Sequence, residues 1–226
     1  MKLSKFNEIG RSMVEMLGVL AIIGVLSVGA IAGYSKAMMK YKLNKHAESF
    51  NQLLNNVIHL KPQLEQSFRD YSKFDFETFS KLNLIPDGMT ADVKNKVILD
   101  NFGTRIYYYV GYHNEGRTFE NYFNIVLSQD GAKVTKEKTE VCHNIVNIAK
   151  ENAANIHNLQ TRNHLEVSYS TFIRYGDLST NTDPEKLLRN MTLEDVEQFC
   201  YACTSEKQCA FMLYVDVQNG LPTKEE

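Results

Sequence analysis

The 226-residue sequence predicts an α+β fold in which a long N-terminal α-helix, transmembrane in its first half, packs on an antiparallel β-sheet head. An apolar run from Met16 to Ala32 leaves no polar face and approaches the roughly 20 residues that span hydrocarbon. Segments rich in Ile, Tyr and Val follow later, which is typical of strands. Between them, one helical face recurs at four- and three-residue steps through Leu43, Ala47, Phe50, Leu54 and Val57.

Composition fits one globular domain behind the apolar segment. About 190 residues remain after that segment, enough for one core but not for two comfortable domains. The formal net charge is −2, and no basic cluster joins a stacking platform of aromatics, so nucleic acid is not indicated as a partner. No serine elbow, Walker loop or dinucleotide fingerprint occurs, and we expect neither enzymatic activity, nor catalytic residues, nor a cofactor.

The first ten residues form a short leader. It carries Lys2 and Lys5 and ends at Gly10, which is typical of a processing segment to be excluded from the fold. Cleavage after Gly10 would give a free amine at Arg11 and place Glu15 fifth. A carboxylate in a membrane-spanning segment costs roughly 2.5–3.5 kcal/mol, so it indicates a partner or a function.

Through the motif GRSMVE, Gly10 to Glu15, and the apolar run after it, the chain resembles a type IV prepilin or type II secretion pseudopilin. The resemblance extends to about Met38. It implies that prepilin peptidase cuts after Gly10 and methylates the new amine, although Arg11 replaces the apolar residue of most members. It also implies that Glu15 pairs with the first amine of a neighbouring subunit, because opposite charges attract strongly in a low-dielectric bundle.

The resemblance implies a structural subunit of a pilus or of a secretion filament, with a role in cell adhesion or type II secretion. Its partners would be copies of itself in a helical filament, other pilins, prepilin peptidase, an inner-membrane assembly platform and membrane lipid. The chain would cross the inner membrane once with a periplasmic head, and then enter a pilus or pseudopilus. The apolar filament core would include Met13, Val14, Leu17, Leu20, Ile23 and Leu26.

Other interpretations of the apolar segment remain open. An ordinary secretory signal would use Ala30-Ile31-Ala32 as its cleavage site. A simple membrane anchor would carry an extracytoplasmic binding or metal-stabilised domain that does not polymerise. A buried core helix is disfavoured because the run lacks a polar face.

The absence of proline between Gly10 and Lys61 predicts one helix from the membrane into the head, with a break near Gly33-Tyr34 as the alternative. We therefore expect a leader at 1–10, a transmembrane and assembly half at 11–33, a soluble helical half at 34–61 and a globular head at 62–226. Pro62 is expected to close or kink the first helix, with a short second helix from Gln63 to Tyr71.

In the head, the turn chemistry of Ile85 to Gly88 separates a helical segment from a region of strands. The expected strands are Thr104–Tyr112, Asn121–Leu127, Leu165–Tyr175 and Ala210–Val217, and the expected helices are Asp75–Leu84, Val141–His157 and a helix capped by Thr192 that runs through Cys203. This order resembles a type IVb pilin head, whereas the short leader is typical of type IVa, so the subclass stays open.

The cysteines are Cys142, Cys200, Cys203 and Cys209. In an exported head they indicate disulfides, and four cysteines allow three connectivities. Pilins commonly have one bridge that ties the C-terminal region to the sheet. This habit favours Cys142 with Cys200, leaving Cys203 with Cys209. The alternative is a structural zinc site made from these thiolates and His143.

Overall fold

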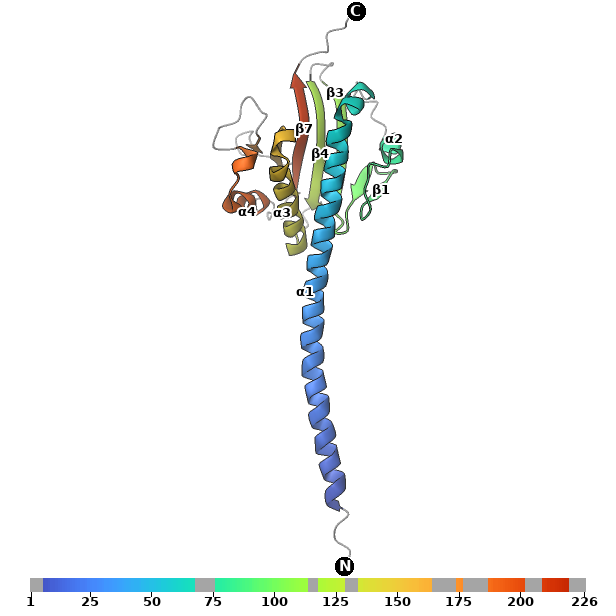
Figure 1. The fold of residues 1–226 in the computed structure, drawn as a ribbon, viewed down its shortest axis with the longest axis vertical. Helices are drawn as coiled ribbons and strands as arrows, with labels where there is room; N and C mark the ends of the chain where they lie inside the picture. Colours follow the sequence, from blue (N-terminus) through green and yellow to red (C-terminus); the bar gives the residue numbers. More distant parts are fainter. Residues whose placement is uncertain are drawn as a thin grey trace, which may run out of the picture. The chain divides into compact units, whose positions relative to one another are not determined.

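The computed structural model describes residues 6–67, 76–113, 118–128, 134–163, 174–176, 187–201 and 209–219 (Figure 1). The chain forms two compact units, Met1–Lys42 and Leu43–Glu226. The first unit is helical wherever it is described, and the second contains the sheet and all other helices described here. The unit boundary therefore falls within the helical segment that we expected at 34–61.

Helix α1 runs from Phe6 to Ser67. It passes Gly33-Tyr34 without interruption, so the single-helix prediction holds over the two-helix alternative. The helix begins before Gly10, and the backbone of Gly10 and Arg11 is therefore helical in the uncut chain.

Pro62 lies inside α1, so the expectation that it closes the helix was wrong, and no separate helix begins at Gln63. Proline within a helix costs about 3 kcal/mol through its missing N–H and its clash with an earlier carbonyl. Two contacts join the last turns to the rest of the unit: Leu64 is buried, and Lys61 Nζ lies 2.9 Å from Asp216 Oδ2 of β7. Of the predicted second helix, residues 68–71 lie outside the described residues.

The sheet of the second unit has seven strands among the described residues, and every neighbouring pair is antiparallel, as predicted. Strand β7 lies inside the sheet, between β4 and β5, and so joins its two parts. Figure 1 shows β7 beside β4. In spatial order the strands are β1 (Thr90–Asp92), β2 (Val97–Leu99), β3 (Arg105–His113), β4 (Thr118–Ser128), β7 (Cys209–Asn219), β5 (Asn158–Asn163) and β6 (Arg174–Tyr175).

The remaining described helices are shorter than α1; the first of them precedes the strands, and the others lie between strands in the sequence. They are α2 (Phe76–Lys81), α3 (Lys136–Glu151), the 3-10 helices η2 (Ala153–Asn155) and η5 (Leu188–Asn190), and α4 (Leu193–Tyr201). The helix predicted through His157 was wrong at that end. Asn152 caps α3, its side-chain amide donating to the Ile148 carbonyl at 2.9 Å, and the chain then pairs with β7 as strand β5.

Strands β1, β2 and β5 were not predicted. β1 and β2 have three residues each, too few to show alternation, and β5 is polar. Of the strand expected at Leu165–Tyr175, the structure describes only Arg174 and Tyr175, which form β6; the rest lies outside the described residues. The helix expected through Cys203 ends at Tyr201 as described, and residues 202–208 also lie outside.

The core of the second unit joins buried side chains of α1, α3 and α4 to those of the sheet. Phe50 and Leu54 of α1 are fully buried, and the Phe50 ring lies 6.2 Å from that of Phe123 on β4. The aromatic chain continues to Tyr108 on β3, whose ring lies 5.0 Å from Phe123 and 4.6 Å from Phe79. Burial raises the pKa of the Tyr108 hydroxyl above its ordinary value.

A buried polar contact ties α1 to the turn between β2 and β3. Asp100 Oδ1 accepts hydrogen bonds from the backbone N–H groups of Phe102 and Thr104 at 2.8 and 2.7 Å. Asp100 Oδ2 lies 3.2 Å from Nε2 of His46 on α1, and both side chains are almost completely buried. Gly103 takes φ +69° in this turn, a conformation that favours glycine. The His46 ring also stacks on Phe50.

We expect Asp100→Ala to lower the free energy of unfolding by about 3–5 kcal/mol, because His46 loses its buried partner and two N–H groups lose their acceptor. The matched control is Asp92→Ala. Asp92 is an exposed carboxylate that accepts from Asn95 N–H in the preceding turn, so its loss should have a much smaller effect. Urea unfolding of the detergent-solubilised chain, followed by near-ultraviolet circular dichroism of its tyrosines, measures both. Equal losses would contradict a special role for the buried contact.

Candidate functional site: the exposed apolar part of helix α1

The first unit leaves an unusually apolar surface uncovered. The large apolar side chains from Met13 to Ile31 are between 52% and 75% exposed. Exposure on all sides excludes the buried-core interpretation of this segment within the chain itself. Among the described residues, one helix is long enough and apolar enough to cross a membrane, and this segment belongs to it. The segment can therefore bury its surface only in lipid or against another molecule.

The side chains that we predicted for a filament core all belong to this surface. Because they are distributed round the helix, the segment has no single docking face and suits an environment that is apolar on every side. Exposed members are Met13, Val14, Leu17, Leu20, Ile23 and Leu26.

Glu15 is the one acidic residue among these apolar side chains, and it is exposed. It lies one helical turn, about 6 Å along the axis, after Arg11. Residues four apart share a helix face, so cleavage after Gly10 would place a new amine on the same face as the Glu15 carboxylate. The sequence-predicted Gly10, Arg11 and Glu15 thus lie along one stretch of helix, and the side chain of Arg11 is outside the described part.

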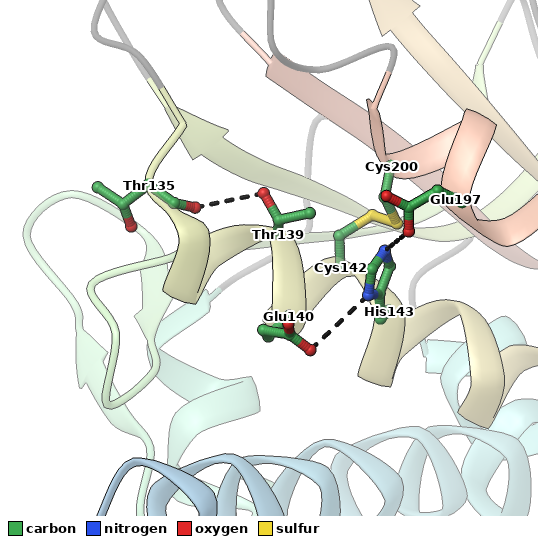
Figure 2. The surroundings of a disulfide bond; sticks show 7 residues. All are labelled: Thr135, Thr139, Glu140, Cys142, His143, Glu197 and Cys200. Carbon is green, nitrogen blue, oxygen red and sulfur yellow. Dashed lines mark hydrogen bonds and ion pairs between the residues drawn. A yellow bond between two sulfur atoms is a disulfide. The ribbon is translucent and has the colours of Figure 1, made fainter. Parts of the chain in front are cut away.

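A disulfide joins two helices of the second unit. Cys142 of α3 and Cys200 of α4 are bonded, with 2.03 Å between their sulfurs, and both are buried (Figure 2). This is the pairing that the resemblance favoured, although it links α4 to α3 and not to a strand. It also removes two of the thiolates that the zinc alternative requires. Cys203 lies outside the described residues and only the backbone of Cys209 is described, so their pairing stays a prediction.

His143 lies beside this bridge, between two carboxylates. Its Nε2 lies 3.0 Å from Glu197 Oε2 of α4, and its Nδ1 lies 3.8 Å from Glu140 Oε2 of α3 (Figure 2). The His143 ring thus places a polar contact between α3 and α4 beside the disulfide. The sequence had suggested His143 only as a zinc ligand.

Comparison with protein-family models, with curated proteins and with solved structures found no match to this chain. A functional assignment therefore depends on the residues themselves, above all on Gly10, Glu15 and the exposed apolar helix.

We expect the double variant Cys142→Ala/Cys200→Ala to lower the free energy of unfolding by about 2–4 kcal/mol, because the bridge restricts a long loop of the unfolded chain. The control is Cys203→Ala/Cys209→Ala, whose predicted bridge would close a much shorter loop, so the double variant should cost less. Urea unfolding under non-reducing conditions measures both. An unchanged midpoint for the first variant would show that the α3–α4 contact is held by other interactions.

Proposed function

We propose that this chain is a structural filament subunit, a pilin or pseudopilin that is cut after Gly10 and assembles through the first part of α1. Its head would be displayed on a bacterial type IV pilus or on a type II secretion-like filament. The proposal needs no catalytic residue and no cofactor in this chain.

The observation that carries the proposal is the exposed Glu15 carboxylate within a helix that is otherwise apolar on all sides. A plain membrane anchor has no need of this charge, which makes insertion less favourable. In a bundle of such helices, a positive amine from a neighbour would neutralise it at low dielectric. The charge therefore supports a role in association between copies.

The geometry of one turn suggests how the charge sets the stagger between subunits. The amine of a cleaved chain and its own Glu15 lie about 6 Å apart along the axis. A neighbouring helix shifted by about this distance would bring its Glu15 level with that amine. The aliphatic side chains would already be out of water in the membrane, so they would contribute to association through close packing against one another, while Glu15 would select the stagger.

We expect Gly10→Ala to leave the precursor uncut in a cell that carries prepilin peptidase. The reason is that the peptidase accepts a small, flexible residue at the cleavage position, as the resemblance implies. Intact-mass analysis of the membrane fraction measures whether cleavage has occurred, since the uncut chain has a mass of 25.9 kDa. Gly18→Ala is the control, because a Cβ at Gly18 meets nothing within 4 Å. A normally shortened Gly10→Ala chain would count against peptidase recognition.

We expect Glu15→Ala to insert in the membrane normally but to be absent from sheared filaments, because the amine of a neighbour finds no carboxylate. Glu48→Ala is the control, since Glu48 is an exposed carboxylate of the same helix that pairs with Lys45. Immunoblots of membrane and filament fractions measure both. If Glu15→Ala enters filaments at the normal level, the chain is better described as an anchor with a binding head.

A further inference from the structure

The apolar surface of α1 ends in a belt of basic and aromatic side chains. Lys36, Lys40 and Lys42 are exposed, as are Tyr34 and Tyr41 at 68% and 56%. We call these five residues the collar. The sequence contains no Asp or Glu from Met16 to Ala47, so no acidic residue of this stretch offsets the positive charge of the collar.

The collar lysines differ from the next lysine along the helix. Lys45 Nζ lies 2.6 Å from Glu48 Oε2 and is thus paired within the chain. Within the part of the chain that the structure describes, Lys36, Lys40 and Lys42 have no such ion pair. Their charge is available to a partner outside the chain.

The collar lies one membrane thickness from Glu15. At about 1.5 Å per residue, Glu15 and Lys36 are roughly 31 Å apart along the axis, and the hydrocarbon core of a bilayer is about 30 Å thick. With Glu15 at one boundary, the collar falls at the opposite one. Tyrosine and lysine are the residues that favour this boundary, where a ring or an ammonium group reaches the headgroups.

The directions of the lysines favour a lipid surface over a single protein face. At about 100° per residue, Lys42 points roughly 120° away from Lys36 and 160° away from Lys40 around the helix axis. One docked protein would meet only part of this arrangement. A plane of headgroups that surrounds the helix meets all of it.

We propose that the collar binds the phosphate groups of anionic phospholipids and holds the unassembled subunit at a defined depth in the membrane. This inference rests on the membrane stage of the proposed function and is independent of filament assembly. It names the lipid partner: anionic phospholipid, with phosphatidylglycerol as the probe.

The test uses the full chain in vesicles. Because the sequence has no Trp, Tyr34→Trp places a single fluorescent reporter in the collar. The chain is reconstituted in mixed phosphatidylcholine and phosphatidylglycerol, with bromine on one lipid or on the other at equal mole fraction. We expect brominated phosphatidylglycerol to quench the reporter about twofold or more strongly than brominated phosphatidylcholine, since each lysine near an anionic surface attracts it.

The variant Lys36→Gln/Lys40→Gln/Lys42→Gln should abolish this preference. The matched control, Lys94→Gln/Lys96→Gln/Lys136→Gln, removes the same charge from exposed lysines of the second unit and should keep it. Equal quenching by both lipids in the Tyr34→Trp chain would contradict the proposed binding of anionic phospholipid by the collar. So would a loss of cross-linking between copies in the collar variant without any lipid preference, because the lysines would then serve a neighbouring subunit.

If neither lipid quenches the reporter, the collar does not lie at the membrane. That result would contradict both the membrane stage of the proposed function and the lipid binding of the collar. A clear lipid preference in a chain that never enters filaments would support the collar and contradict the filament function. The two proposals are therefore separated by their results.

Discussion

The second unit depends on the burial of one face of α1 against the antiparallel sheet. Phe50 on the helix and Phe123 on β4 meet at the centre of this core. A polar contact fixes the helix on each side of the aromatic centre: His46 with Asp100 before it, and Lys61 with Asp216 after it. Apolar burial supplies most of the stabilisation, while the directional polar contacts select the register of the helix on the sheet.

One helix serves two environments. From Met13 to Ile31 its large side chains are apolar and exposed on every side, whereas from Phe50 onward only one face is apolar and that face is buried. The first pattern suits lipid or a bundle of helices, and the second suits a globular core in water. The lysines of the collar mark the change between them. As a monomer in water, such a chain would expose the apolar side chains of its first segment to solvent. This unfavourable exposure is the physical basis of the proposed membrane and filament stages.

The later part of the chain is held by long-range links. Strand β7, the last of the described strands, pairs with β4 on one side and β5 on the other, so the sheet is complete only when β7 is in place. The Cys142–Cys200 bridge then ties α4 to α3 across 58 residues. Both links join segments that are distant in sequence. Only the covalent bridge restricts the unfolded chain, whereas the pairing of β7 must close long loops as the chain folds.

The sequence by itself determined the features that depend on near neighbours. The helical period and the absence of early proline predicted α1, the high content of Ile, Tyr and Val predicted β3, and the Gly10-to-Glu15 motif indicated the candidate site. These features could be predicted because each depends on residues that are close together in the sequence.

Only the tertiary structure decided which distant residues meet. His46 and Asp100 looked isolated in the sequence, and only the docking of α1 on the β2–β3 turn brings them to 3.2 Å. Strand β5 escaped prediction because its polar side chains find partners across the sheet, as Gln160 does when it donates to the Tyr214 hydroxyl. Pro62 lies within the helix although its local propensity is unfavourable, and the turns around it contact the rest of the unit through Lys61 and Leu64. Helix propensities differ by up to about 0.7 kcal/mol between ordinary residues, whereas full burial of one large apolar side chain contributes about 1.5–3 kcal/mol.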